Sequence, residues 1–348
     1  MIYRSTQEDI QNYFDSPALN QSTLKIIERG VSEFLEAQAT QDAVIPDYLK
    51  IGSAVDCILT EGEEAFQNQF YVSTIESIPS MGELKVLAEV KNQVAMFYTG
   101  HEKEPLESYR DAILTAVNAC DYQKNWKDET RVNKIIANCS DYWTMLTESD
   151  GKIILTEQDS MTIRDAVNRV QNSPIFDESL NPRKFADQPS DHICFQLPIF
   201  FTYKGVDCKA MLDCVRIYEH ESQLEIYPFD LKTTSGMLIN FPNTIKRFRY
   251  DIQAQFYREA LMEFAKRTYP HATSIRIHDF SFVAVSTTEH GYAAMFTLTS
   301  DYYTNELVDN KDRMDLDQMM DKYIYQTQNG FENDMEIMSN DYKVTLCS

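Results

Sequence analysis

Two aspartates and a lysine stand out because each lies within a short run of apolar residues. Asp213 lies in the run Ala210–Val215, and Asp230 and Lys232 lie in Tyr227–Thr234. Both runs are rich in the residue types that favour β-strands, and the polar stretch 219–223 between them predicts a hairpin. Side chains alternate along a strand, so Asp230 and Lys232 share a face, roughly 6–7 Å apart along the chain axis. Asp213 on the neighbouring strand can then complete a polar cluster.

Such a cluster could bind a metal ion. Two nearby carboxylates each resist ionisation unless a cation lies between them. Hard divalent cations such as Mg²⁺ prefer oxygen ligands of this kind, and a lysine beside the metal can orient or deprotonate a water. A second interpretation stays open, in which Asp230 and Lys232 form an exposed ion pair and Asp213 only caps a turn.

Further residues in chain order extend the pattern. Gln253 and Tyr257 are four residues apart, so a helix places them on one face. Together with two upstream helical stretches the ordered pieces are Leu24–Ile27, Leu49–Asp56, Asp213, Asp230–Lys232, Gln253 and Tyr257. This combination resembles the PD-(D/E)XK nuclease superfamily, and within it the phage-type and exonuclease VIII (RecE-like) DNA exonucleases. The resemblance covers roughly residues 20–285 in separate pieces.

The resemblance implies an α/β fold, a PD-(D/E)XK (restriction-endonuclease-like) core in which helices flank a central mixed β-sheet. It also implies Mg²⁺-dependent hydrolysis of DNA, with Mn²⁺ as a substitute. Asp213, Asp230 and the backbone carbonyl of Leu231 would bind the metal. Lys232 would position or activate water, and Gln253 and Tyr257 would orient the site or the scissile strand. Relatives digest linear duplex DNA from 5′ to 3′ in phage-type recombination, form ring-shaped homo-oligomers and work with a single-strand annealing protein.

Two positions depart from the family pattern. The family often has histidine where this chain has Asp56, and glutamate where it has Gln196. Aspartate can replace histidine as a ligand of a hard cation, whereas glutamine offers a carbonyl oxygen without charge. Asp56 is therefore expected either as a further metal ligand or as a solvated helix position, and Gln196 as an outer ligand. One-metal and two-metal chemistry both stay open.

A local basic segment favours DNA binding, whereas the net charge of the whole chain opposes it. The segment 246–250 is the most basic short run, and basic groups interleaved with aromatics suit phosphate and base contacts. The expected DNA contacts are Lys246, Arg247, Arg249 and Arg258. The net charge is 32 − 54 = −22, which opposes long-range attraction to a phosphate backbone. The rival hypotheses are a non-catalytic acidic binding protein on a degenerate nuclease fold and a structure-specific endonuclease.

Apolar spacing and composition along the chain predict four regions. Residues 1–73 form the N-terminal helices of the core, 74–150 a helical insertion, 151–299 the catalytic core, and 300–348 an acidic helical segment. Ser22 is the expected N-cap of a helix that runs to about Ala39. Gly52 is small enough to permit close approach of another backbone beside the active strands, although it could equally be a neutral helix position.

Three local signals give further expectations. Thr156 and Asp159 predict a capping box at the start of a helix. Residues 203–205 predict a hairpin turn. The seven cysteines include no C-x-x-C pair, which indicates free thiols in a reducing cytoplasm, that of a bacterial host if the gene is phage-encoded. No apolar run approaches the roughly 20 residues that span a bilayer, and the N-terminus lacks an apolar signal region.

Overall fold

The computed structural model describes residues 1–39, 47–75, 78–97, 104–149, 151–185, 191–288, 292–299, 302 and 313–329. The chain divides into two compact units. Unit 1 comprises Met1–Glu63 with Thr162–Ser348, and unit 2 comprises Glu64–Met161. Most of the expected C-terminal helical region, 300–301, 303–312 and 330–348, lies outside the described residues. No helix in the described ranges is long and apolar enough to cross a membrane.

Within the described part of unit 1, seven strands form one mixed sheet in the order β1-β4-β5-β6-β8-β9, with β7 also paired to β6. The strands are β1 (Ile2–Arg4), β4 (Asp191–Tyr203), β5 (Val206–His220), β6 (Gln223–Thr234), β7 (Ser274–Ile277), β8 (Phe280–Ser286) and β9 (Ala293–Leu298). The hairpins β4–β5, β5–β6 and β8–β9 are antiparallel, whereas β1 pairs with β4, and β7 and β8 pair with β6, in parallel. The prediction of a mixed sheet flanked by helices is confirmed in these terms.

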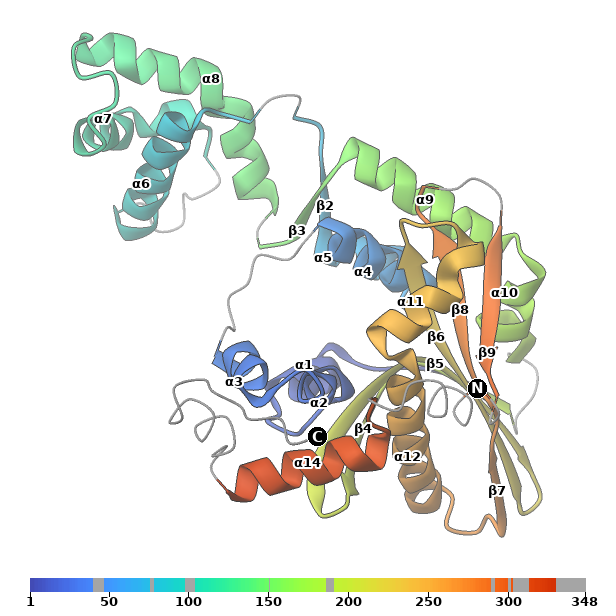
Figure 1. The fold of residues 1–348 in the computed structure, drawn as a ribbon. Coiled ribbons are helices and arrows are strands. Elements are labelled where there is room, and N and C mark those ends of the chain that lie inside the picture. Colours follow the sequence, from blue (N-terminus) through green and yellow to red (C-terminus); the bar gives the residue numbers. More distant parts are fainter. Residues whose placement is uncertain are drawn as a thin grey trace. The chain divides into compact units, whose positions relative to one another are not determined.

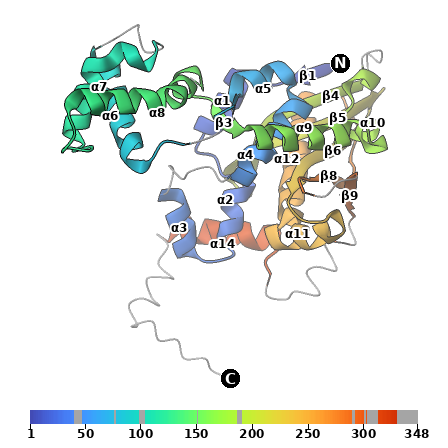
Figure 2. The ribbon, with the colours of Figure 1, turned by 90° about the horizontal axis from the view of Figure 1, so that it is seen from above.

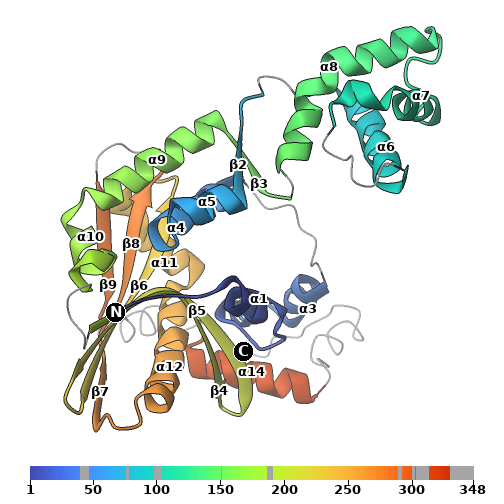
Figure 3. The ribbon, with the colours of Figure 1, turned by 180° about the vertical axis from the view of Figure 1, so that it is seen from behind.

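Helices cover both faces of this sheet (Figures 1 and 2). The helix α4 contacts β5 and β6, α12 contacts β4, β5 and β7, and Figure 3 shows α10 in front of β9, which it contacts. The unit 1 helices are α1 (Gln7–Asp15), α2 (Gln21–Ile26), α3 (Val31–Ala39), α4 (Asp47–Thr60), α10 (Pro174–Ser179), α11 (Phe241–Phe248), α12 (Tyr250–Thr268) and α14 (Leu316–Gln328). Short 3₁₀ turns lie at Pro182–Phe185 and Leu238–Asn240.

The main core of unit 1 lies between the sheet and the α2, α12 and α14 side. It is built from the buried apolar side chains of β4, β5, β6 and β8 and from one stripe of each helix, Leu24 and Ile27, Phe256 and Leu261, and Met319 and Met320. Burial of apolar area at roughly 25 cal/mol per Å² makes this layer the main source of its stability.

Unit 2 is a helical bundle with a two-stranded sheet at its base. Helices α6 (Met81–Phe97), α7 (Arg110–Ala119) and α8 (Asp128–Ser149) share a core that contains Trp143 and Tyr109. Strands β2 (Phe70–Ser73) and β3 (Ile153–Thr156) pair in parallel. The 3₁₀ turn Leu106–Tyr109 leads into α7, α5 (Glu63–Gln69) enters the unit and α9 (Glu157–Gln171) leaves it.

Three turn and cap expectations can be compared directly with the structure. The capping box is confirmed, since Asp159 N donates to Thr156 Oγ1 at 3.0 Å and Thr156 N donates to Asp159 Oδ2 at 2.9 Å. The hairpin turn at 203–205 is also confirmed, because Lys204 and Gly205 link β4 to β5 with φ of 49° and 82°. The prediction of a single helix capped by Ser22 is wrong. Asn20 is the cap, with its side chain accepting from Thr23 N at 2.9 Å, and the helix ends at Ile26 before α3 begins.

Of the two expectations for Gly52, close approach beside the active strands is confirmed, with the side chain of Thr233 rather than a backbone as the neighbour. A Cβ added at Gly52 in α4 would lie 2.9 Å from Oγ1 of Thr233 in β6. Real side-chain carbons essentially never approach that closely, so only glycine lets α4 sit this near the strand that carries Asp230 and Lys232.

Replacing Gly52 with alanine is expected to lower the free energy of unfolding by about 1 kcal/mol. The overpacking against Thr233 costs about 1–3 kcal/mol and outweighs the better helix propensity of alanine. Urea unfolding of Gly52→Ala tests this, with Gly52→Ala made also in a Thr233→Ala background that lacks the clashing oxygen. In that background the same substitution should be neutral or stabilising. Equal destabilisation in both backgrounds would contradict the assigned contact.

Candidate functional site

The site forms where β5 and β6 separate. Their antiparallel ladder ends at the pair Cys214–Phe229, and β6 then continues alongside β8 from Phe229 to Thr234. Asp213 and Asp230 are the next residues beyond the last pair, so they lie at the mouth of this fork. The carboxylate of Asp213 accepts a hydrogen bond from Leu231 N at 2.8 Å. An acidic side chain thus takes the backbone donor that the diverging strand no longer satisfies.

Asp230, Lys232 and Gln253 form a connected group at the fork. The Lys232 ammonium makes an ion pair with Asp230 Oδ2, so the two side chains share a face as their spacing predicted. Gln253 Nε2, from α12, donates to Asp230 Oδ1 at 2.6 Å. Asp230 is 2% exposed and the Lys232 side chain is 20% exposed. The interpretation of an exposed strand ion pair is therefore wrong, because the carboxylate is buried.

Asp56 and Gln196 meet on the α4 side of the site. Gln196 Nε2 donates to Asp56 Oδ2 at 2.7 Å and lies 3.3 Å from Thr60 Oγ1. Gln196 lies between the pairs Phe195–Cys214 and Leu197–Leu212, opposite Asp213, and has φ of 50°. A non-glycine residue with positive φ is uncommon, and such strain is concentrated at functional sites. The side-chain amide of Gln196 thereby reaches Asp56 and Thr60 in α4.

The three carboxylates influence one another. Burial, followed by the negative charges of Asp230 and Glu61, raises the pKa of Asp56 to about 7. Burial, followed by the charges of Asp230 and Asp56, raises the pKa of Asp213 well above its ordinary value. For Lys232, burial lowers the pKa, but the attraction of Asp230 and Asp213 outweighs it and the net pKa is raised. The site therefore crowds three carboxyl groups around one protonated amine, and Asp56 and Asp213 hold their protons more tightly than a free aspartate does.

These residues offer a donor set that suits a hard cation. Asp56 Oδ1 is buried and has no hydrogen-bond partner among the described residues, and a buried carboxylate oxygen left unpaired is costly. Among those same residues, no three His, Cys, Asp or Glu side chains are close enough to form a ready metal site. The donor chemistry of Asp56, Asp213 and Asp230 suits a hard cation, but the three carboxylates do not form a ready site as they stand, and Gln196 and Lys232 occupy two of them directly.

The buried Asp56 carboxyl makes the stability of the metal-free protein depend on pH. Its ordinary pKa is 3.8 and its folded pKa is about 7, so the folded protein binds this proton more tightly than the unfolded chain does. The stabilisation is fully present below about pH 4 and is lost as pH rises through about 7. A shift of roughly three units corresponds to at most about 4 kcal/mol.

Asp56→Asn is expected to flatten this pH dependence and to stabilise the metal-free protein near pH 8. Urea unfolding at about pH 5 and about pH 8, with a chelator present, measures the effect. Asp111→Asn, on an exposed face of α7, removes the same charge as a control. Asp213 contributes in the same direction, so part of the slope should remain. An unchanged slope in Asp56→Asn would show that the carboxyl is not buried as described.

Lys25 and Tyr250 also lie at the site, although the sequence patterns did not assign them to it. The Lys232 ammonium lies 5.0 Å from the centroid of the Tyr250 ring, and the Lys25 ammonium lies 5.8 Å from that same centroid. Lys25, in α2, also donates to the carbonyl of Phe248 at 3.1 Å. Burial, followed by repulsion from Lys232, lowers the pKa of Lys25 to about 7. The stretch Leu24–Ile27 had marked this helix, but nothing in its spacing singled out the lysine.

The predicted DNA-contacting residues separate into two groups. Arg247 and Arg258 are exposed, whereas Lys246 is half-buried. Arg249 is 6% exposed and has left-handed φ and ψ at the junction between α11 and α12. This placement does not leave Arg249 available as a DNA contact.

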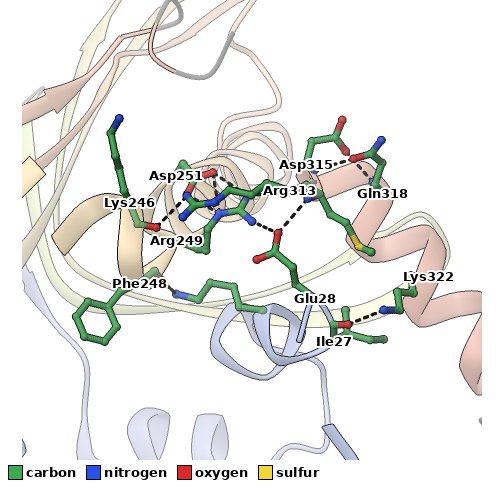
Figure 4. Close-up of polar contacts among 12 residues, drawn as sticks. Ile27, Glu28, Lys246, Phe248, Arg249, Asp251, Arg313, Asp315, Gln318 and Lys322 are labelled. Atoms are coloured by element: carbon green, nitrogen blue, oxygen red, sulfur yellow. Dashed lines mark hydrogen bonds and ion pairs between the residues drawn. The ribbon is translucent and has the colours of Figure 1, made fainter. Parts of the chain in front are cut away.

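Figure 4 shows what Arg249 does instead. Its guanidinium makes ion pairs with Glu28 and Asp251 and donates to the Met314 carbonyl at 2.6 Å. Glu28 Oε1 also accepts from Met314 N at 3.0 Å. Asp251 is in the first turn of α12, two residues before Gln253. The network therefore fixes the start of the helix that presents Gln253 to Asp230.

Tyr257 lies one turn beyond Gln253 on the same helix. It is buried, and its ring centroid lies 5.9 Å from that of Phe280 in β8. Burial, followed by the charges of Asp230, Tyr13 and Asp213, raises its pKa well above the ordinary value. Tyr257 therefore lies beneath the fork as a neutral phenol packed on the strand beside β6. Its role in orienting the site stays a prediction.

Comparison with known proteins adds a weak likeness among the solved structures. No protein-family model matches the chain, and no curated protein sequence matches it. A crystal structure described as a putative exonuclease from Eubacterium rectale is 12% identical, with 94% of this chain and 87% of that chain covered, at a TM-score of 0.43. A likeness at that level supports no inference about activity, so the functional argument depends on the site itself.

Proposed function

We propose that this protein is a divalent-metal-dependent deoxyribonuclease and that the fork between β5 and β6 is its active site. One observation carries the proposal. Asp213 and Asp230 lie on diverging strands beside a protonated lysine, with Gln253 holding Asp230 from a neighbouring helix. Buried like charges of this kind are costly unless a cation offsets them.

The residues that would hold the cation are Asp213, Asp230 and Asp56, with the Leu231 carbonyl as a further ligand by family resemblance. When bound, Mg²⁺ or Mn²⁺ supplies Lewis-acid chemistry, lowering the pKa of a bound water and offsetting charge on the phosphoryl group. Gln196 lies behind Asp56 and orients its carboxylate. Gln253 does the same for Asp230.

Lys232 has a positioning role in this proposal. Its pKa is raised, so the amine stays protonated and acts as a hydrogen-bond donor. It would hold the attacking water or a non-bridging phosphate oxygen beside the carboxylates. The water oxygen bonds to phosphorus and releases a proton to solvent, the bond from phosphorus to the leaving deoxyribose oxygen breaks, and that oxygen takes up a proton from solvent.

The form of the activity that we propose is exonuclease action on linear duplex DNA. The family resemblance adds 5′-to-3′ polarity and use in phage-type recombination. It also adds a ring-shaped homo-oligomer and a strand-annealing partner. The exposed or half-exposed cations Lys246, Arg247 and Arg258 give a local basic face for the phosphate backbone. Such a local face is needed because the net charge of −22 repels DNA at long range.

An end-labelled linear duplex incubated with Mg²⁺ or Mn²⁺ tests this proposal, with covalently closed circular DNA as the control. The expected result is progressive shortening of the linear duplex and an intact circle. Cleavage of the circle would replace the exonuclease with an endonuclease. If neither substrate is cut with either metal, the enzyme proposal fails and an acidic binding protein remains.

A further inference from the structure

The two tryptophans of the chain have opposite environments in unit 2. Trp143 is 2% exposed, packs edge-on against Tyr109 at 5.5 Å and donates its indole N–H to the Glu104 carbonyl. Trp126 is 43% exposed and is not among the residues that form or pack against the core of unit 2. Its large apolar ring therefore contributes little to the fold, and an aromatic residue left at the surface needs another explanation.

Basic residues lie near the exposed indole, one in space and two in sequence. The Lys134 ammonium lies 4.8 Å from the centroid of the Trp126 ring, which is itself 43% exposed. Lys124 and Lys127 flank Trp126 in sequence and are both exposed. Residues 122–134 contain four Lys or Arg and two Asp or Glu, and one of those acids, Asp128, is paired with Arg131. This segment is locally positive in a chain whose net charge is −22.

The loop that carries Trp126 is held in place by its neighbours. Arg131 is buried and donates to the carbonyls of Val117 and Tyr122, and the Tyr122 hydroxyl donates to Glu83. Trp126 N donates to the Gln123 carbonyl at 2.8 Å, directly before α8 begins. A ring presented on a fixed loop loses little conformational entropy when a ligand covers it.

We propose that Trp126, with Lys124, Lys127 and Lys134, is a binding surface for single-stranded nucleic acid. An open indole face stacks on a base of any sequence, and the flanking ammonium groups contact the phosphates on either side. The occupant is a single strand, because duplex bases are already stacked on one another and do not present their faces. The inference rests on the proposed function, since an enzyme that digests one strand of a duplex leaves the other strand single.

Intrinsic fluorescence of the full-length protein tests the stacking directly. Trp143 is buried, so Trp126 is the fluorophore that a ligand can reach. Titration with an oligothymidylate in the presence of a chelator, where no metal-dependent cleavage occurs, should quench the wild-type signal. In Trp126→Phe, which keeps an aromatic ring but only Trp143 as fluorophore, the quenching should disappear.

Affinity for a dye-labelled oligothymidylate, measured by anisotropy, provides the second readout. Trp126→Ala should weaken binding at least about fivefold, because base stacking on an aromatic side chain contributes that much. Lys127→Ala should weaken binding and lower the salt slope by about 0.7, the value for one phosphate contact on a single strand. Lys91→Ala removes an exposed lysine of α6 and is the control with the same change in charge.

Binding without quenching, equal affinities of Trp126→Ala and wild type, or no binding at all would each overturn this surface. Duplex cleavage with added metal is scored separately. Cleavage without stacking refutes only the surface, and stacking without cleavage refutes only the nuclease.

Discussion

Replacing Lys232 with methionine is expected to reduce DNA hydrolysis by about 10²–10⁴-fold while Mg²⁺ binding persists. The methionine keeps the length and apolar stem of the side chain and removes the ammonium that would hold the attacking water. The carboxylates of Asp213 and Asp230 remain to bind the cation. Initial rates on a linear duplex, normalised to folded protein, measure the effect.

The same variant should be less stable in the absence of metal. Lys232 offsets the buried charge of Asp230, and removing one partner of a buried ion pair costs about 3–5 kcal/mol. Added Mg²⁺ should restore part of this loss, so its stabilising effect should be larger in the variant than in the wild type.

Lys209→Met is the matched control for the loss of a buried lysine. Lys209 lies on β5 and donates to the Tyr13 and Ser16 carbonyls, each at 2.7 Å, away from the fork. Its replacement should lower stability and leave hydrolysis per folded molecule near the wild-type rate. If Lys232→Met hydrolyses DNA as fast as the wild type, the lysine has no part in the mechanism.

Asp230→Asn is expected to reduce hydrolysis by about 10³-fold or more. The contribution of a bound metal to transition-state stabilisation is worth several kcal/mol, and each 1.36 kcal/mol is a factor of about ten in rate. Asparagine keeps an oxygen that can accept from Gln253, so the position of α12 should be preserved. What disappears is the negative charge that would hold the cation.

A second signature separates loss of metal from loss of fold in this variant. The charge of Asp230 raises the pKa of Asp213, so its removal should move that pKa back towards its ordinary value. Asp213 titration, followed by isotope-edited infrared or NMR, reports the change. Asp207→Asn, at an exposed position of β5, the strand that carries Asp213, is the control for the change in charge. An active Asp230→Asn enzyme would remove this carboxylate from the site.

The arrangement of the fork follows from local sequence rules. The alternation of side chains placed Asp230 and Lys232 on one face, and the polar stretch after Glu219 placed the hairpin. The four-residue spacing of Gln253 and Tyr257 placed both on one face of α12. In each case a short-range rule decides the geometry, so no knowledge of distant contacts was needed.

The errors arise where long-range contacts decide. A basic residue before a helix usually faces solvent, but Arg249 is drawn inward by Glu28, more than two hundred residues earlier in the chain, and by Met314 near its end. One error is local instead: the helix expected to reach Ala39 ends at Ile26, and Asn20 rather than Ser22 caps its start through a hydrogen bond from Thr23 N. Lys25 joins the site only because α2 lies beside Tyr250.

Trp126 illustrates a different limit. Apolar spacing identified the helices of the insertion but could not distinguish a tryptophan that fills the core from one that is displayed beside lysines. Only the packed helices separate Trp143 from Trp126.

Calorimetric titration of the metal-free protein with Mg²⁺ and Mn²⁺ measures whether Asp213 and Asp230 hold one of these cations, on which the proposed hydrolysis depends. The wild type should bind with measurable heat, and Asp230→Asn should bind at least about tenfold more weakly. If the wild type binds neither cation, or if Asp230→Asn binds as tightly as the wild type, these carboxylates do not form a metal site and the proposed nuclease activity is wrong.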